Sequence, residues 1–350
     1  MKHRHIGIKH QKMLVTEIRS TTYVLLSSAR IRLSVNRIRQ PTNMALKQTV
    51  LVIIVSVFVY KLTGVFIANT FDGSELIGKN IIITGASSGI GEQLAYQYVR
   101  YGANIFITAR RERRLQEVIE KCRSLGTSKQ KYGFLSADMG KVEDRGKVIE
   151  TAMEFFGDID QLILNHAILP PVFKWSGTPE QLEHLHVTLN VNMVSFVHLT
   201  AAALSSLRRT SGSVCVVGSG SGKIPTPFAL EYTASKFALD GFFSGLRYEL
   251  KTAKENVSIT HCFLGYISTE AGCKSFDKIM SMYESPNKFL IDHLQPGKPE
   301  DAAQAIISAT TRRLGELYFP SYQMIWLTSV IRSIFSDSDS LFSMEFAKDK

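Results

Sequence analysis

Three glycines, Gly85, Gly89 and Gly91, directly follow a short apolar run at residues 81–83 and precede a helical pattern. The run is typical of a strand buried on both faces, and a second β-rich run follows at 104–108. This order predicts one strand–helix–strand unit. Glycines at its first turn let the backbone approach a pyrophosphate, whose charge the helix N-terminus stabilises. Because the spacing is G-x-x-x-G-x-G and not G-x-G-x-x-G, a tight turn without a ligand stays open as an alternative.

Arg110 ends the second predicted strand, 19 residues after Gly91. At this position a dinucleotide-binding unit carries either an acid for the ribose 2′-hydroxyl or a cation for a 2′-phosphate. The cation, with Arg111 beside it, favours NADP(H) as the cofactor.

The charge of the chain is concentrated at its N-terminus. Residues 1–43 contain nine Lys/Arg and one Glu, a net +8, whereas the whole chain of 350 residues is +10. The rest therefore carries only +2, which argues against a nucleic-acid partner for the folded part. The four cysteines form no CxxC pair and no metal-type cluster, so no metal site is expected. Cys215 and Cys262 lie in apolar runs, which favours buried free thiols over a disulfide.

Three interpretations compete for residues 1–43, which are almost free of acids and lack periodicity. They are a disordered basic arm, a mitochondrial targeting segment, or sequence upstream of a start at Met44. The first and third are favoured, because an apolar segment at 46–68 follows at once.

The segment 46–68 predicts a single-pass membrane anchor. Its apolar residues span about 19 positions, enough to cross the hydrocarbon core as a helix, with Lys61 as an interruption that can snorkel. A buried helix of a soluble domain is the alternative. Positive charge upstream would hold the N-terminus in the cytoplasm. We therefore expect an endoplasmic reticulum membrane protein whose catalytic domain is lumenal.

Strands and helices alternate from residue 79 onward. This order predicts an α/β fold, a Rossmann-type doubly wound parallel sheet of about seven strands in a single domain over 76–320. Residues 321–350 are expected to form an apolar C-terminal helix and a tail. The predicted strands are 80–84, 104–108, 132–137, 161–165, 213–218, 258–264 and 316–319. The predicted helices are 91–101, 111–125, 142–156, 179–208 (as two helices), 229–252 and 299–313.

Ligands of such sheets lie beyond the carboxyl ends of the strands, so the residues there are candidates for the chemistry. Tyr232 and Lys236 begin a long helix and share one of its faces, since they are four residues apart. A tyrosine with its ordinary pKa near 10 is a poor catalyst at neutral pH. Positive charge from Lys236 and an oxidised nicotinamide would lower that pKa. Ser219, at the end of the preceding strand, can hydrogen-bond a substrate oxygen.

Together the glycine motif, Asn165, Asn192, Ser219 and the Tyr232-x-x-x-Lys236 pair resemble the short-chain dehydrogenase/reductase family over about residues 76–320. Within this family, the segments 162–166, 232–243, 256–260 and 264–270 resemble the 11β-hydroxysteroid dehydrogenase type 1 group and its type 1-like relatives. That likeness includes the N-terminal anchor.

The resemblance implies a role for each matching residue. Tyr232 would be the acid/base, Lys236 would hold the nicotinamide ribose and lower the tyrosine pKa, Ser219 would orient the carbonyl or alcohol, and Asn192 would order a proton-relay water. The glycines would meet the pyrophosphate, Asp138 the adenine and Asn165 the adenosine side, and Ile267 and Thr269 would border the carboxamide. The implied cofactor-binding residues are Gly85, Ser87, Ser88, Gly89, Ile90, Gly91, Arg110, Arg111, Asp138, Met139, Asn165, His166, Tyr232, Lys236, Ile267 and Thr269.

Three departures from the family pattern stand out. His166 follows Asn165 where the family usually has a second asparagine, as in the type 1 group. Gly218 and Ser219 replace a serine pair, which loses one hydroxyl. Ser88 stands where the type 1 enzyme has a lysine toward the 2′-phosphate, so the preference for NADP rests on Arg110, helped by Arg111.

These features predict a membrane-anchored oxidoreductase that moves hydride between NADP(H) and a carbonyl or secondary alcohol on an apolar small molecule, with a steroid as the candidate substrate. The alternatives are a retinoid, sphingoid or xenobiotic carbonyl, and a non-catalytic cofactor-binding scaffold. Loops at 170–175, 224–228 and 276–289 would either wall an apolar pocket or be packed surface loops.

A homodimer is expected through the helix that starts at residue 229. Its small residues Ala238, Gly241 and Gly245 permit a close helix approach, and family members pair through this helix. The sequon Asn256-Val-Ser258 predicts N-glycosylation if the domain is lumenal.

Overall fold

The protein is described here by a computed structural model, which covers residues 71–282 and 296–320. The predicted N-terminal arm, membrane anchor and C-terminal helix and tail lie outside these residues. Within them, seven strands form one sheet in the order β3-β2-β1-β4-β5-β6-β7, and all six pairings are parallel. The strands are β1 Asn80–Thr84, β2 Asn104–Ala109, β3 Tyr132–Ser136, β4 Gln161–Leu164, β5 Ser213–Val217, β6 Ser258–Leu264 and β7 Glu316–Phe319. The doubly wound parallel sheet is confirmed.

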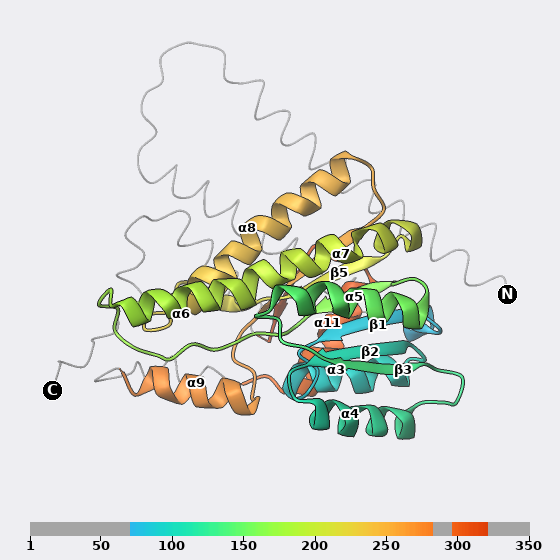
Figure 1. The fold of residues 1–350 in the computed structure, drawn as a ribbon, viewed down its shortest axis with the longest axis horizontal. Helices are drawn as coiled ribbons and strands as arrows, with labels where there is room; N and C mark the ends of the chain where they lie inside the picture. The colour runs from blue at the N-terminus through green and yellow to red at the C-terminus, as the bar shows by residue number, and fades with distance from the viewer. Residues whose placement is uncertain (1–70, 283–295, 321–350) are drawn as a thin grey trace, which may run out of the picture. The chain divides into compact units, whose positions relative to one another are not determined.

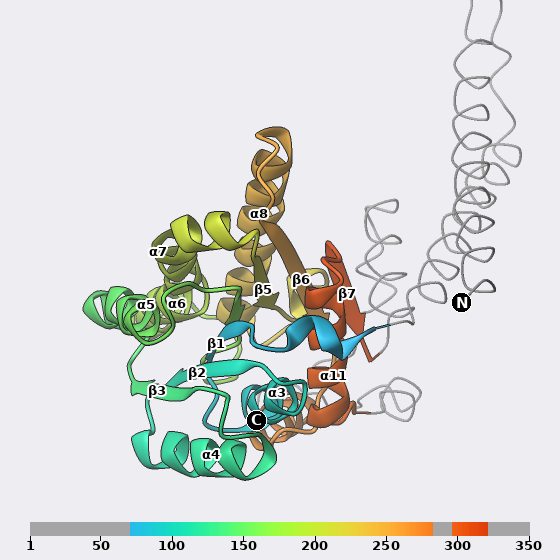
Figure 2. The same cartoon turned by 90° about the vertical axis from the view of Figure 1, so that its right-hand side faces the viewer.

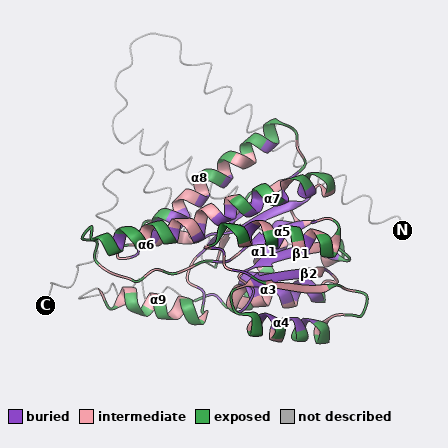
Figure 3. Cartoon of the chain, viewed as in Figure 1, coloured by how far each residue is buried: buried purple, intermediate pink, exposed green. Residues whose placement is uncertain are grey.

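Helices cover both faces of the sheet, because its strands bury apolar side chains on both sides (Figures 1 and 2). In β1, Ile81 and Ile83 belong to one apolar cluster and Ile82 to the other. The first cluster includes helices α3 Gly89–Arg100, α4 Glu112–Leu125 and α11 Pro299–Thr311, and the second includes α5 Val142–Phe156, α7 Ser195–Thr210 and α8 Leu230–Thr252. The sheet is therefore the buried middle layer of three (Figure 3).

The predicted helical region 179–208 is two α-helices joined by a π-helical turn. Thr178 caps α6 Pro179–Leu189 through a capping box with Gln181, and the π-turn η2 Asn190–Val194 leads into α7. Pro179–Thr210 is also the one described helical stretch with the length and mean hydropathy, 1.4, to cross a membrane. It packs against α5 and α8, so we interpret it as a core helix of the domain.

One segment differs from its predicted state. Residues 276–280, expected in a loop, belong to helix α9 Glu270–Met280, and 283–289 lie outside the described residues. Thr269 caps this helix, since its Oγ1 accepts a hydrogen bond of 3.0 Å from the Gly272 N–H. No residue of α9 is fully buried. Its apolar residues Phe276, Ile279 and Met280 have helical spacing but line the cavity instead of the core, and the loop prediction overlooked that spacing.

Cys215 and Cys262 lie on the neighbouring strands β5 and β6. Both are fully buried, and their sulfur atoms are 3.6 Å apart, so they are free thiols as predicted.

The turn between β1 and α3 demands glycine for two different reasons. Gly85 and Gly89 have φ of +67° and +59°, a backbone region that side chains disfavour. A Cβ on Gly91 would instead lie 2.3 Å from the Gly85 carbonyl oxygen and 2.6 Å from Asn165 Nδ2. The first constraint is conformational, and the second is the close packing of helix on strand.

We expect Gly91→Ala to lower the free energy of unfolding by about 1–3 kcal/mol, because the new methyl group overlaps backbone that cannot move away. Gly146→Ala is the matched control. Gly146 is also inside a helix, α5, but nothing lies within 4 Å of its added Cβ, so this change should stabilise by roughly 0.5–1 kcal/mol. Urea unfolding measures both. Equal effects of the two substitutions would contradict the assignment.

Candidate active site

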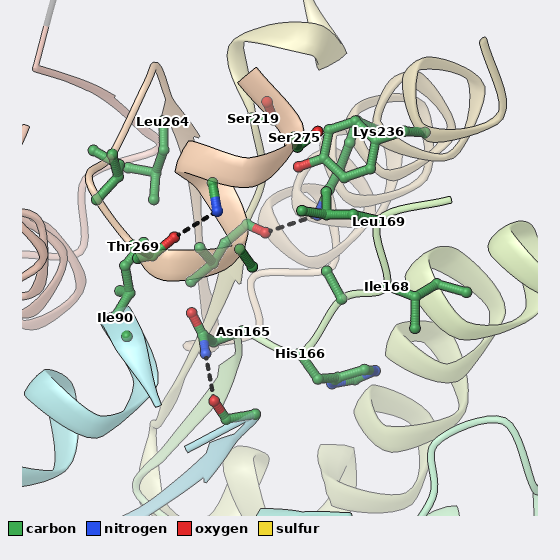
Figure 4. Close-up of a pocket in the computed structure, with 18 of the residues that line it drawn as sticks. Ile90, Asn165, His166, Ile168, Leu169, Ser219, Lys236, Leu264, Thr269 and Ser275 are labelled. Carbon is green, nitrogen blue, oxygen red and sulfur yellow. Dashed lines mark hydrogen bonds between the residues drawn. The ribbon is translucent and has the colours of Figure 1, made fainter. Parts of the chain in front are cut away.

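A cavity of about 1160 Å³ opens at the carboxyl ends of the strands (Figure 4). Almost all of the site residues predicted from the sequence line this cavity. Most of them follow the carboxyl ends of β1 to β6, and Tyr232 and Lys236 come from α8. Those that line it are Gly85, Ser87, Ser88, Gly89, Ile90, Arg110, Arg111, Asp138, Met139, Asn165, His166, Ser219, Tyr232, Lys236, Ile267 and Thr269. In Figure 4, Ser219 and Lys236 lie together on one side, and Ile90 and Thr269 lie on another.

Two of the predicted residues do not line the cavity. Gly91 packs beneath the turn against Gly85 and Asn165. Asn192 is fully buried in the π-turn. Its amide binds one backbone residue twice: Oδ1 accepts from Ile168 N–H at 2.8 Å, and Nδ2 donates to Ile168 C=O at 2.9 Å.

A network of short hydrogen bonds joins the ends of β1 and β4. Asn165 Nδ2 donates to the carbonyls of Thr84 and Gly85, at 3.1 and 3.2 Å. The buried His166 ring bridges Thr84 Oγ1 at 2.8 Å and Ser195 Oγ, at the start of α7, at 2.6 Å. Burial, with the positive charge of Lys236, lowers the pKa of His166 to about 3. The imidazole is therefore neutral at physiological pH and acts as a fixed bridge.

Tyr232, Lys236 and Ser219 form the polar centre of the cavity. Lys236 Nζ donates to the Val217 carbonyl at 3.2 Å and lies 5.5 Å from the centre of the Tyr232 ring. Burial lowers the pKa of Lys236 to about 8. Burial raises the pKa of Tyr232, and a hydrogen bond from Ser219 only partly opposes this. The expected lowering of the Tyr232 pKa is thus not produced by these side chains alone.

The phosphate-binding end of the cavity is organised by Arg111. Its Nη2 donates to the hydroxyls of Ser87 and Ser88 on the glycine turn, at 3.0 and 2.8 Å. The exposed Arg110 lines the same end. Arg114, which the sequence reading missed, also lines it and donates to the Ser87 carbonyl at 3.4 Å. Arg114 is three residues after Arg111, on the same face of the predicted helix 111–125, and this spacing could have indicated it. Glycine backbone and guanidinium groups together fit a dinucleotide with several phosphates.

The replacement of the family's first serine by Gly218 has a steric reason. A Cβ on Gly218 would lie 2.5 Å from His261 Nε2. His261 on β6 is 1% exposed, and its ring occupies the space that a side chain at residue 218 would need. Burial, with the nearby Lys236, Lys223 and Arg247, lowers the pKa of His261 to about 3, so this ring too is uncharged.

The other end of the cavity is mostly apolar. Its walls come from the segment after β4, the segment before α8, and helix α9. These residues are Leu169, Pro170, Val172, Ile224, Pro225, Pro227, Phe276, Ile279 and Met280. The expected loops thus contribute to the cavity wall, with α9 supplying its part as a helix.

Comparison with known proteins agrees with this geometry. The short chain dehydrogenase family model matches residues 79–279. The chain belongs to this family. It is 44% identical over 259 residues to the hydroxysteroid 11-beta-dehydrogenase 1-like protein of Gallus gallus, covering 74% of this chain and 84% of that protein. The protein of the same name from Danio rerio is 41% identical over 255 residues, 73% of this chain and 83% of that protein.

A solved structure supports the fold. The alcohol dehydrogenase from the archaeon Thermococcus sibiricus, complexed with 5-hydroxy-NADP, superposes with a TM-score of 0.57 at 23% identity, covering 70% of this chain and 97% of that chain. Family and fold together make this short-chain dehydrogenase an oxidoreductase with a nicotinamide-dinucleotide-binding fold.

The Lys236 pKa predicts a pH limit for carbonyl reduction. The ammonium is present below about pH 8 and is lost as the pH rises through that value, because its pKa is lowered to about 8. We expect kcat for reduction to decline above this pH. In Lys236→Arg, whose guanidinium stays charged, the residual activity should lose that decline. A native rate that is constant from pH 7 to roughly pH 9.5 would contradict the assignment.

Proposed function

We propose that this short-chain dehydrogenase transfers hydride between NADP(H) and a carbonyl or secondary alcohol of an apolar small molecule, with a steroid as the first candidate. The observation that carries the proposal is the position of Tyr232, Lys236 and Ser219. They line one cavity together with the glycine turn, Arg110 and Arg111, and with a group of apolar side chains.

In this mechanism each residue acts on a defined atom. The nicotinamide supplies or accepts the hydride when it is bound. Tyr232 donates its phenolic proton to the substrate oxygen during reduction and accepts a proton during oxidation. Ser219 orients the same oxygen. The Lys236 ammonium, together with an oxidised nicotinamide when that is bound, would supply the positive charge that favours the phenolate, and Asn192 holds the segment at Ile168 beside the reacting centre.

Tyr232→Phe tests the catalytic assignment. It keeps the ring and the helix but removes the only hydroxyl proposed to exchange a proton with the substrate. General acid–base catalysis is typically worth 10²–10⁴-fold, so we expect kcat to fall by about that factor while NADPH binding persists. Lys236→Ala should damage both. Near-native turnover by Tyr232→Phe would mean that the chemistry uses other residues.

The preference for NADP over NAD is attributed to Arg110 and Arg111 as a pair. Arg111 is already held at the glycine turn by the two serine hydroxyls. Arg110 directly follows β2 and lines the same cavity. Two guanidinium groups on one side of the adenosine ribose would bind a 2′-phosphate through charge-assisted hydrogen bonds.

Binding measurements with both cofactors test this pair. Arg110→Asp and Arg111→Ala should each raise the Kd for NADPH by about 10- to 100-fold, the effect of losing a charged hydrogen bond, and change the Kd for NADH little. Arg113→Ala is the control, because Arg113 lies in the first turn of α4, two residues after Arg111, but its side chain is 92% exposed and pairs with Glu117. Equal native affinities for NADPH and NADH would refute the preference.

The apolar end of the cavity supports a lipid-like substrate. The curated relatives carry a hydroxysteroid dehydrogenase name, which makes a steroid the first compound class to assay. Retinoids, sphingoid bases and xenobiotic carbonyls fit the same chemistry. A panel of these compounds, followed by NADPH oxidation, ranks them.

We further propose a lumenal catalytic domain anchored in the endoplasmic reticulum by residues 46–68. Asn256 is exposed, although its Oδ1 accepts from Arg313 at 3.1 Å in the folded domain. Glycosidase treatment should therefore increase gel mobility, and Asn256→Gln should abolish the change. Protease added to sealed microsomes should leave the domain intact; its digestion would place the domain in the cytosol.

We propose a homodimer through the face of α8 that carries the small residues Ala238, Gly241 and Gly245. A Cβ added at Gly241 or Gly245 meets nothing within 4 Å, and Phe242 and Tyr248 are exposed on this helix. The surface is therefore open to a second copy. Light scattering in mild detergent distinguishes the dimer from a monomer.

A further inference from the structure

Arg145 on α5 is the largest fully buried polar side chain among the described residues, with 1% exposure. Its contacts are two backbone carbonyls and two side chains. Nε donates to Met139 O at 2.9 Å, and Nη2 donates to Gly140 O at 3.3 Å and to Asn190 Oδ1 at 2.7 Å. Nη1 lies 3.3 Å from His198 Nδ1. Because a guanidinium can only donate, Nδ1 of His198 is the acceptor in this contact.

None of these four partners is a carboxylate. Burying a charge without a carboxylate in direct contact costs several kcal/mol. Burial lowers the pKa of this guanidinium, and the negative charges of Glu143 and Asp138 nearby only partly oppose that effect. An apolar side chain would fill the same helix position without that cost. The role of Arg145 in the structure therefore lies in the hydrogen bonds that it makes.

These contacts join two separate parts of the cavity wall. Asp138 and Met139, in the loop after β3, line the cavity, and so does Val191 in the π-turn. Gly140 is shared between them, because Asn190 Nδ2 also donates to its carbonyl, at 2.9 Å. Arg145, Asn190 and Gly140 thus form a closed triangle that fixes the distance between the loop and the π-turn.

The π-turn transmits this fixed position to Asn192. Ser195 N–H bonds to Asn190 C=O, five residues back, so Asn190 begins the widened turn. Asn192 lies within the turn and holds both backbone groups of Ile168. Ile168 in turn lines the cavity. A shift of Asn190 would therefore move Asn192 and the wall beside the reacting centre.

We propose that Arg145 is a positioning residue that couples the loop 137–140, on the adenosine side, to the π-turn that carries Asn192. The inference rests on the proposed function, since it takes the loop to contact the adenosine side of NADPH and the π-turn to hold, through Asn192, the wall at Ile168 beside Tyr232. Arg145 does not line the cavity and touches neither reactant.

The test compares Arg145→Gln with Asn190→Ala in the full-length protein. Arg145→Gln loses the contacts to both segments, so the Kd for NADPH should rise about tenfold and kcat should fall about 10- to 100-fold, the cost of a misplaced group. Asn190→Ala leaves Arg145 bound to Met139 and Gly140. It should lower kcat to a similar extent with little change in the Kd for NADPH. The double variant Arg145→Gln/Asn190→Ala should have the same kcat and the same Kd for NADPH as Arg145→Gln alone, because both substitutions break the same triangle of hydrogen bonds.

Two readouts separate positioning from a loss of stability. The solvent deuterium isotope effect on kcat should increase in both variants, because proton delivery becomes slower while hydride transfer is unaltered. Amide hydrogen exchange should accelerate at 138–141 and at 190–195. Arg145→Lys, which keeps the charge and a single donor nitrogen, should recover part of the kcat lost in Arg145→Gln.

Ser206→Ala is the matched control for stability. Ser206 is buried in α7 near the amino end of β4, far along the helix from the π-turn. Its Oγ accepts from Ile159 N–H at 2.8 Å and donates to Asp158 Oδ1 at 2.9 Å. This variant should unfold more easily but keep native kcat, isotope effect and NADPH affinity.

Variants that lose only stability, with kcat, isotope effect and NADPH affinity like those of native protein, would overturn the inference. If Arg145→Gln does not fold, Asn190→Ala and Arg145→Lys still decide it through the same measurements. A native protein that neither binds NADPH nor turns over any carbonyl would instead refute the proposed function. The two failures are therefore distinguishable.

Discussion

The contact between the β1–α3 turn and the end of β4 is the constraint on which the rest of the site depends. Asn165 bonds to the carbonyls of Thr84 and Gly85, and Gly91 leaves no room for a side chain between them. This contact brings the first turn of α3 to the strand ends, where its free N–H groups can meet phosphate. Because all strands are parallel, the same edge also receives Ser219 from β5. One close backbone approach thus organises the cofactor end and the catalytic end together.

Two buried cations, Lys236 and Arg145, distinguish the interior of this domain. Neither has a carboxylate among the hydrogen-bond partners described for it, and both bond instead to backbone carbonyls. The domain tolerates their desolvation because carbonyl dipoles partly replace water. The neutral His166 and His261 lie nearby without adding charge. Because both imidazoles are uncharged, they do not repel the Lys236 ammonium.

The sequence predicted the fold well because its signals are local. Each strand run and each glycine turn is contiguous, and the seven strands lie within one or two residues of their predicted limits. The cluster of Tyr232, Lys236 and Ser219 followed from the rule that parallel strands end at one edge. Contacts between distant residues left no such signal. Arg145 with Asn190 is separated by 45 positions, and Gly218 with His261 by 43, so neither pair has a recognisable spacing. Helix α9 was missed in part because its helically spaced apolar residues Phe276, Ile279 and Met280 line the cavity and were predicted to form a loop at its wall.

The fit of Gly218 against His261 has a consequence for the order in which this site could change. A Cβ at 218 would lie 2.5 Å from the imidazole and 2.9 Å from the Cys262 carbonyl oxygen, so a serine there needs a smaller residue at 261 and a small shift of β6. A smaller residue at 261 alone leaves a void behind Ser219. The effects of the two substitutions are therefore epistatic. A change from this pair to the family's serine pair would require a smaller residue 261 and an adjustment of β6 at Cys262 before the serine fits, and it would pass through a less stable, cavity-containing intermediate. In the reverse direction, residue 218 has to become glycine before residue 261 can become histidine.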